Sequence, residues 1–156
     1  VSYARTFSTA SDSLLFMGAT GLGKTLLSGC IARAVADRGY SVCYVSAGKL
    51  FSDFETEKFR LKEDGALTGE YLQTDLLIID DLGTEMTTQF TVSALYQIVN
   101  GRLLSGKPTI VSTNLPDTEL EARYSAQIAS RLLGAYTLYQ FCGTDVRLLR
   151  KMESRG

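Results

Sequence analysis

The sequence predicts an α/β fold in which a mostly parallel β-sheet lies between layers of helices. Short apolar runs alternate along the chain with longer stretches whose apolar residues recur at helical spacing. Parallel strands of this kind need right-handed crossover connections, and the connecting helices then cover both faces of the sheet. A glycine-rich segment also separates the first apolar run from the first helical stretch, which is the position of a phosphate-binding loop in such folds.

The composition limits the number of domains and excludes several classes of protein. The chain has 156 residues, of which 45% are hydrophobic, and these can bury one sizeable core. We therefore expect a single domain over residues 1–156, with residues 1–13 as a lead-in segment packed on it. A net charge of −1 gives no general attraction for nucleic acid, and the lack of histidine excludes an imidazole base or ligand. No apolar run is long enough to span a membrane, so a cytosolic location without membrane partners is expected.

The first half of the chain alternates strand and helix. Residues 13–17 form a short apolar run and are predicted as a buried strand. After the glycine-rich segment, apolar residues recur at helical spacing as far as Gly39, where we expect the first long helix to end. Residues 41–46 are rich in β-forming residues and follow a turn signal, which predicts a second strand. The half ends with a helix over residues 49–61, a turn at 64–65 and a short helix that reaches residue 73.

The second half continues this alternation. Residues 75–80 are predicted as a buried strand, because four apolar residues at 76–79 precede the carboxylates of Asp80 and Asp81. A helical pattern over residues 89–104 stops at a Gly-Lys-Pro sequence. The cysteines lie in apolar segments without metal-binding spacing, so buried thiols are expected rather than metal ligands or disulfides. The remaining elements are a strand at 109–113, a helix over 120–133 and a last strand at 136–141.

The glycine-rich segment matches the pattern of a phosphate-binding loop. Residues 18–25 read GATGLGKT and fit G-x-x-x-x-G-K-[ST] between a predicted strand and a predicted helix. The glycines allow a tight turn, so that backbone N–H groups and the helix N-terminus point at phosphates. Lys24 adds a positive charge, and Thr25 adds a hydroxyl ligand for Mg²⁺. The predicted nucleotide-binding residues are Gly18, Ala19, Thr20, Gly21, Leu22, Gly23, Lys24 and Thr25.

Two later strands end in polar residues that suit phosphate chemistry. Asp80 and Asp81 follow four apolar residues in the pattern of a Walker B strand, which places Asp80 to hold Mg²⁺ and Asp81 to orient an attacking water. Asn114 ends the sequence Ser-Thr-Asn after the next strand, from where it would reach toward a γ-phosphate. A strand that ends in a polar turn is the structural alternative for both motifs. Their occurrence downstream of a complete phosphate-binding loop favours the functional interpretation.

The order of the motifs resembles the DnaC/IstB group of AAA+ ATPases, which includes replicative helicase loaders and transposition ATPases. The resemblance rests on GATGLGKT, LLIIDDLG and STN, followed by residues 128–132 and 143–147. It implies a three-layer P-loop NTPase fold with a five-stranded parallel sheet in the order 5-1-4-3-2, ATP bound at subunit interfaces, and single-stranded DNA held by an assembled oligomer. By position, Asn114 would be the sensor I residue, Arg131 the arginine finger and Arg147 the sensor II arginine.

Two departures from the group's pattern modify these expectations. Many AAA+ proteins end the Walker B strand in Asp-Glu, whereas Asp81 is one methylene shorter, so we expect slow ATP hydrolysis. Full-length loaders carry an N-terminal domain that grips the replicative DNA helicase, and we expect this chain to be the motor fragment without it. Because nine residues follow Arg147, a C-terminal helical lid is also expected to be absent.

Several functions are compatible with these motifs. The leading prediction is an ATP-controlled helicase loader of DNA replication. The alternatives are an IstB-like transposition ATPase, a P-loop kinase of a small metabolite, and a nucleotide-binding partner protein that does not hydrolyse ATP. A kinase would need a lid with several arginines and an acceptor pocket, whereas the two carboxylates of Walker B and Arg131 favour hydrolysis with an arginine supplied by a neighbouring subunit.

A contact with single-stranded DNA is predicted on one local surface. Between residues 49 and 64 four basic residues meet five acidic ones, so a single subunit should bind DNA weakly and an assembly more strongly. A solvated helix with one stray aromatic residue is the alternative. The predicted DNA-binding residues are Lys58, Phe59, Arg60, Thr88 and Phe90.

Overall fold

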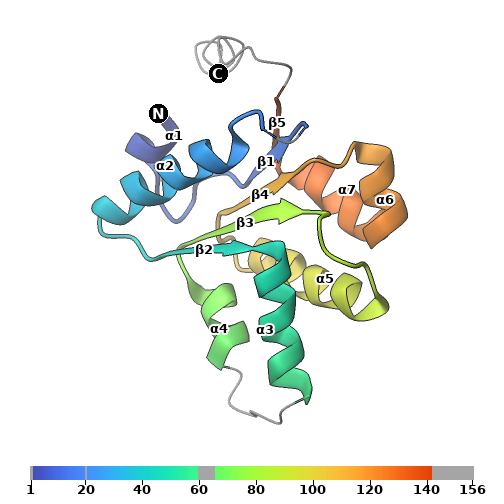
Figure 1. The fold of residues 1–156 in the computed structure, drawn as a ribbon. Helices are drawn as coiled ribbons and strands as arrows, with labels where there is room; N and C mark the ends of the chain where they lie inside the picture. Colours follow the sequence, from blue (N-terminus) through green and yellow to red (C-terminus); the bar gives the residue numbers. More distant parts are fainter. Residues whose placement is uncertain (1, 20, 60–65, 142–156) are drawn as a thin grey trace.

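The computed structural model describes residues 2–19, 21–59 and 66–141, which form a parallel sheet between two helical layers (Figure 1). Five strands in this part of the chain pair in the order β2-β3-β4-β1-β5, and all four pairings are parallel. Read from the other edge, this is the order 5-1-4-3-2, so the fold prediction is confirmed. The strands are β1 Leu14–Met17, β2 Val42–Ser46, β3 Leu76–Leu82, β4 Thr109–Thr113 and β5 Thr137–Gln140.

Helices cover both faces of the sheet (Figure 1). On one face α1 Ser2–Thr6 packs on α2 Lys24–Asp37, which contacts β2, β3 and β4. The other face is covered by α3 Ala47–Phe59, α4 Ala66–Gln73, α5 Gln89–Leu104, α6 Asp117–Tyr124 and α7 Ala126–Ala135. No helix in the described ranges is both long and apolar enough to cross a membrane.

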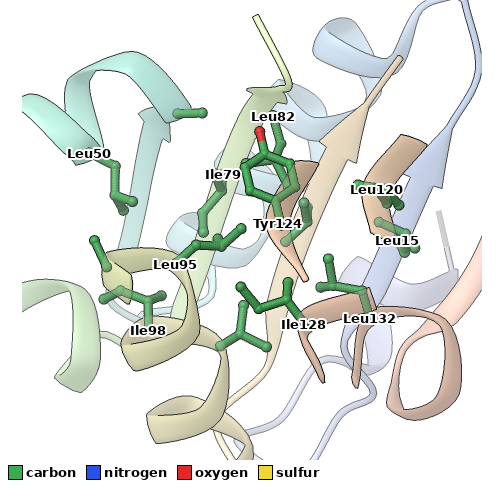
Figure 2. Close-up of a cluster of buried hydrophobic side chains, with 14 of the residues drawn as sticks. Leu15, Leu50, Ile79, Leu82, Leu95, Ile98, Leu120, Tyr124, Ile128 and Leu132 are labelled. Atoms are coloured by element: carbon green, nitrogen blue, oxygen red, sulfur yellow. The ribbon is translucent and has the colours of Figure 1, made fainter. Parts of the chain in front are cut away.

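The alternation of side chains along the strands divides the core in two. Successive residues of a strand point to opposite faces of the sheet. In β3, Leu77 and Ile79 therefore join the larger cluster beneath α3, α5, α6 and α7. Figure 2 shows Ile79 of this cluster near Leu95 of α5. Leu76 and Ile78 join the smaller cluster against α2. Each fully buried aliphatic side chain stabilises the fold by about 1.5–3 kcal/mol.

The lead-in segment is packed more deeply than its composition suggested. Phe7 is 1% exposed and belongs to the smaller core cluster, where its ring meets the ring of Tyr40. Arg38, just after α2, donates to the backbone oxygens of Ala4 at 3.0 Å and of Phe7 at 2.9 Å. The residues around α1 are thereby tied to the carboxyl end of α2.

The helix predicted over residues 120–133 is wrong in one respect, because the structure has two helices there. Ser125 separates α6 from α7 with a φ of 136°, and its hydroxyl accepts from the N–H of Ile128 at 3.2 Å as the cap of α7. The break turns the chain so that Tyr124 of α6 and Ile128 of α7 both reach the larger core cluster. Periodicity alone did not predict it, since the apolar spacing continues across the cap.

The prediction of buried thiols is wrong for one cysteine. Cys30 is exposed because it lies on the solvent side of α2, and Cys43 in β2 is half-buried. Cys142 lies outside the described residues.

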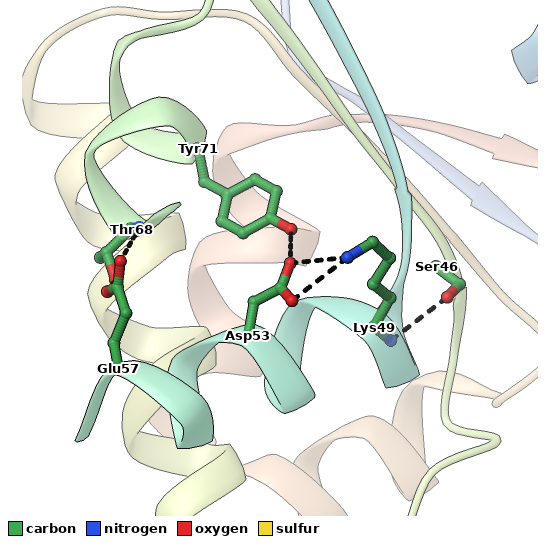
Figure 3. Close-up of polar contacts among 6 residues, drawn as sticks. All are labelled: Ser46, Lys49, Asp53, Glu57, Thr68 and Tyr71. Atoms are coloured by element: carbon green, nitrogen blue, oxygen red, sulfur yellow. Dashed lines mark hydrogen bonds and ion pairs between the residues drawn. The ribbon is translucent and has the colours of Figure 1, made fainter. Parts of the chain in front are cut away.

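Hydrogen bonds to two carboxylates join α3 to α4 (Figure 3). Asp53 accepts from the ammonium group of Lys49 at 3.1 Å and from the hydroxyl of Tyr71, and Glu57 accepts from the N–H and hydroxyl of Thr68. The contacts fix the two helices against each other.

A buried guanidinium closes the amino end of the sheet. Arg102, near the end of α5, has no exposed surface. Its Nε donates to the hydroxyl of Thr109 at 2.7 Å. Its other donors reach five backbone oxygens, those of Tyr71, Leu72, Thr74, Asp75 and Pro108, at 2.7 to 3.5 Å. One side chain thus holds the end of α4 and the starts of β3 and β4 together.

Candidate nucleotide-binding site

The candidate site lies at the carboxyl ends of β1, β3 and β4, the edge at which parallel sheets bind ligands. Gly18, directly after β1, has a φ of 146°, and a Cβ there would collide with the backbone of Phe141. Gly23 has a φ of 90° and precedes α2 without a side-chain cap, so the first N–H groups of α2 are open to a ligand. Of the other predicted loop residues, Ala19, Gly21 and Leu22 lie between these glycines, and Thr20 is outside the described residues.

Lys24 bends back over this loop. Its Nζ donates to the backbone oxygens of Gly18 and, at 2.8 Å, of Ala19, and the residue is 6% exposed. Burial lowers the pKa of Lys24, while the nearby carboxylates of Asp81 and Asp80 act in the opposite direction. The loop therefore encloses a cation at the place where the sequence predicts phosphates.

Asp80, at the carboxyl end of β3, accepts hydrogen bonds from three hydroxyl groups. Thr25 donates to its Oδ2 at 3.0 Å, Tyr44 to the same oxygen at 2.7 Å, and Ser112 to Oδ1. These donors come from α2, β2 and β4, and the carboxylate is 5% exposed. The alternation of the strands explains the meeting, because Tyr44, Asp80 and Ser112 all lie on the face of the sheet that α2 covers. The two predicted metal ligands, Thr25 and Asp80, are thus adjacent.

Asp81 points elsewhere because the backbone changes direction after Asp80. Its φ is 58°, in the left-handed region that few residues other than glycine adopt, and the pairing of β3 with β4 shifts between Ile79 and Leu82. The N–H of Asp81 donates to the hydroxyl of Ser112 at 3.1 Å. Its side chain is exposed, so one carboxylate is buried among hydroxyls and the next faces solvent.

Asn114 lies beside the loop, after the end of β4. It is exposed and lines a pocket of about 350 Å³ together with Gly18 and Ala19. Leu133 of α7 and Gln140 of β5 form other walls of this pocket. The structure therefore brings Asn114 to the phosphate-binding loop.

Arg131 does not lie at the loop of its own chain. Its Nε donates to the side-chain oxygen of Asn100 at 3.0 Å, and its guanidinium lies 5.1 Å from the ring centroid of Tyr96. Both partners are on α5, across the sheet from α2. Arg147 lies outside the described residues.

The predicted DNA surface is brought together only in part. The ammonium group of Lys58 at the end of α3 lies 5.0 Å from the ring centroid of Phe90 at the start of α5. Thr88 caps α5, since its hydroxyl accepts from the N–H of Thr91 at 3.2 Å, and Phe90 packs half-buried against the larger core cluster. Arg60 and the side chain of Phe59 lie outside the described part of the chain.

Sequence reasoning missed two contributors to this region. Tyr44 is an ordinary strand residue by sequence, and only the register of β2 on β3 brings it to Asp80. Arg123 of α6 holds the segment after β3, because its guanidinium donates to the backbone oxygens of Gly83 and Glu85 and to the hydroxyl of Thr87. A lone arginine in an exposed helix carries no sequence signal for such contacts.

Comparison with known proteins identifies the family. The chain matches the pattern of the IstB-like ATP binding proteins over residues 3–139. It belongs to this family. The chain is 30% identical over 105 residues to an insertion-sequence ATP-binding protein of Mycobacterium tuberculosis, covering 67% of the chain and 41% of that protein. It is 26% identical over 132 residues to the replicative helicase loader DnaC of Escherichia coli, covering 83% of the chain and 54% of DnaC. The chain thus spans about half the length of these relatives.

Solved structures agree with the fold. A crystal structure of the DnaC helicase loader has a TM-score of 0.81 at 20% identity and covers 90% of this chain and 85% of that one. The replication initiator DnaA bound to AMPPCP and single-stranded DNA has a TM-score of 0.79 at 22% identity, and the match covers 99% of this chain and 48% of the DnaA chain. The IstB-like domain described here therefore has the AAA+ P-loop fold of DnaC and DnaA.

Proposed function

We propose that this IstB-like domain binds Mg·ATP and hydrolyses it slowly as the motor of a helicase loader in DNA replication. The observation that carries the proposal is the meeting of Thr25 and Asp80, with 3.0 Å between their oxygen atoms, directly behind a phosphate-binding loop. Membership of an ATP-binding family supports the nucleotide. The similarity to DnaC supports the role in replication, which takes place in the cytoplasm of bacteria.

The residues present fit a magnesium nucleotide. Mg²⁺ prefers oxygen ligands and keeps several waters, and the site offers the hydroxyl of Thr25 and a carboxylate that three hydroxyl groups hold in place. Thr25 and Asp80 would hold Mg²⁺ there, and the ion would supply positive charge that offsets the charge of the phosphates. Lys24 would exchange its contacts with loop carbonyls for contacts with the phosphates.

Hydrolysis is assigned to the exposed groups next to this centre. Asp81 faces solvent at the end of β3 and would orient the attacking water. Asn114 lines the adjoining pocket and would contact the γ-phosphate or that water. An aspartate reaches less far than the glutamate common at this position, so we expect slow turnover.

Arg131 supports an assembly-dependent reaction. Its contacts with Asn100 and Tyr96 lie across the sheet from α2, so it would reach a phosphate only on a neighbouring copy of the chain. The guanidinium is then available to balance charge in the transition state. We expect several copies to assemble with ATP and to hold single-stranded DNA jointly, with Lys58 and Phe90 among the contacts.

The replicative helicase would be bound through a further N-terminal domain. DnaC, of which the chain covers 54%, is a replicative helicase loader. A second candidate function is that of a transposition ATPase, because the relative from Mycobacterium tuberculosis belongs to an insertion sequence. Binding assays with a replicative helicase and with a transposase from the same genome would separate these two functions.

The assignment of the loop is tested by Lys24→Ala. Because the substitution removes the cation that the loop encloses, we expect binding of labelled ATP to be lost. Arg33→Ala, which alters an exposed arginine of α2, is the control and should bind as the parent does. Binding of equal strength by Lys24→Ala would overturn the nucleotide site.

The role of a neighbouring copy is tested by mixing variants. Arg131→Ala should bind ATP normally but turn over up to about 10³-fold more slowly, as with other arginine fingers. A mixture of Arg131→Ala with Lys24→Ala should recover activity at interfaces that pair an intact loop with an intact arginine. A parent rate strictly linear in protein concentration, with Arg131→Ala unimpaired, would rule out this mechanism.

A further inference from the structure

We propose that Tyr44 is a positioning residue for the carboxylate of Asp80 and sets how readily the site takes up Mg²⁺. This inference rests on the proposed function, in which Asp80 and Thr25 hold the metal. Tyr44 belongs to β2, the edge strand of the sheet, and no motif in the sequence includes it.

The geometry at Asp80 gives each hydroxyl a different task. Tyr44 donates to Oδ2 at 2.7 Å and Ser112 donates to Oδ1, whereas the hydroxyl of Thr25 lies within hydrogen-bond distance of both oxygens, 3.0 Å from Oδ2 and 3.3 Å from Oδ1. A carboxylate offers about four acceptor positions, and hydrogen bonds to it are roughly twice as strong as those between neutral groups. Because Tyr44 and Ser112 fix one oxygen each, Thr25 can turn to a metal ion without releasing the carboxylate.

The register of the sheet explains why the residue is a tyrosine. In the pairing of β2 with β3, Tyr44 lies opposite Ile78, and Ser46 lies opposite Asp80. Tyr44 and Asp80 are therefore diagonal neighbours on the face toward α2, a separation of about 7–8 Å that long side chains span. A serine or threonine at position 44 would not reach the carboxylate.

The hydroxyl of Tyr44 is not needed to hold the sheet together. The residue is 39% exposed at the rim of the site, and β2 is already joined to β3 over its whole length from Val42 to Ser46. A tyrosine hydroxyl is protonated at neutral pH, so the group can act as the donor to Asp80 there. Loss of this hydroxyl should change the metal site and leave the fold intact.

The test is a magnesium titration of the whole protein with Tyr44→Phe. Binding of a fluorescent ATP analogue is followed by anisotropy in EDTA and then at rising Mg²⁺ concentration. We expect the half-saturating Mg²⁺ concentration to rise at least roughly tenfold, as for the loss of a hydrogen bond to a charged group. Binding in EDTA and the melting temperature should stay as in the parent.

Tyr40→Phe is the matched control. Tyr40 lies just before β2. Its ring contacts Phe7 and Arg38, and its hydroxyl makes no hydrogen bond within the described residues. The control should therefore keep the parent's half-saturating Mg²⁺ concentration.

Each other outcome has one meaning. An unchanged half-saturating concentration in Tyr44→Phe would overturn the positioning role and leave the nucleotide site standing. A lower half-saturating concentration would show that the hydroxyl competes with the metal, and this would overturn the inference. A lower melting temperature combined with weaker nucleotide binding in EDTA would show a structural role and would overturn it as well. If nucleotide binding by the parent does not depend on the Mg²⁺ concentration, this would contradict the proposed metal site, and this inference with it.

Discussion

A buried charged side chain lies at each end of the parallel sheet, Asp80 at the carboxyl end and Arg102 at the amino end, and their hydrogen-bonding groups are satisfied in different ways. At the carboxyl end Asp80 is 5% exposed and accepts from the hydroxyl groups of Thr25, Tyr44 and Ser112. At the amino end Arg102 has no exposed surface and donates to one hydroxyl and five backbone carbonyl oxygens.

The partners of Asp80 and those of Arg102 differ in whether they can be exchanged. Side-chain hydroxyl groups rotate, so the partners of Asp80 can be exchanged for a metal ion or its waters. Backbone carbonyls are fixed by the elements that contain them, so Arg102 has no freedom to change partners. Burial lowers the pKa of Arg102 to about 10, which still leaves it charged at neutral pH. We infer that the carboxyl end is built for ligand exchange and the amino end for stability.

The largest effect is expected at the exposed carboxylate of the carboxyl end. Asp81→Asn should lower ATP turnover by about 10²–10⁴-fold, the range for general acid–base groups. Asparagine tolerates the left-handed φ of 58°, so nucleotide binding and the free energy of unfolding should stay near those of the parent. Steady-state ATPase assays measure turnover and urea unfolding measures stability, with Asp37→Asn at an exposed position of α2 as the control. Full turnover would place the base elsewhere, and Glu85 would be the next candidate.

At the amino end of the sheet, a substitution should lower the stability of the protein. Arg102→Met removes a donor from five backbone oxygens and should lower the free energy of unfolding by at least about 3 kcal/mol, because each buried acceptor that is left without a partner costs about 1–3 kcal/mol. Arg102→Lys should recover part of this, because an ammonium keeps the charge but not the planar fork. Urea unfolding measures both. If Arg102→Met lowers the free energy of unfolding by no more than Arg33→Met at an exposed position of α2, Arg102 does not hold the amino end together.

The smallest effect is expected at Ser112, whose hydroxyl contacts both the proposed metal ligand Asp80 and the backbone of Asp81. Its hydroxyl donates to Asp80 and accepts from the N–H of Asp81, so Ser112→Ala should cost about 1–3 kcal/mol of stability and also weaken Mg²⁺-dependent nucleotide binding. Ser28→Ala is the control, since Ser28 is equally buried but its hydroxyl has no hydrogen-bond partner in the part of the chain that the structure describes. Equal melting temperatures of the two variants would show that the hydrogen bonds of Ser112 to Asp80 and Asp81 contribute nothing to stability.

The same contrast explains how much could be predicted from the sequence. Lys24, Thr25 and Asp80 belong to contiguous motifs, and the alternation of apolar runs with helical patterns is enough to place those motifs at one edge of a parallel sheet. The sheet order came from the family resemblance. Asn114 was predicted to reach a γ-phosphate from the end of the strand that follows Walker B, and the structure places it beside the loop because β4 is the neighbour of both β1 and β3.

The rest depends on information that no short motif contains. The partners of Arg102 are backbone atoms from separate segments, so residue types around it carry no signal. Tyr44 depends on strand register, and the break at Ser125 depends on the direction in which α7 must pack. The roles of Arg131 and of the DNA-binding residues remain predictions, because they concern neighbouring copies and nucleic acid.

The contrast between the two ends is tested most directly by urea unfolding of three proteins with and without Mg·ATP. At a nucleotide concentration about 100-fold above Kd, binding should add roughly 2.7 kcal/mol to the stability of the parent. Arg102→Lys should start lower and gain the same increment, whereas Asp80→Asn should lose the part that requires Mg²⁺. An undiminished increment in Asp80→Asn, or its loss in Arg102→Lys, would contradict the division of the sheet into a ligand-exchanging end and a stabilising end.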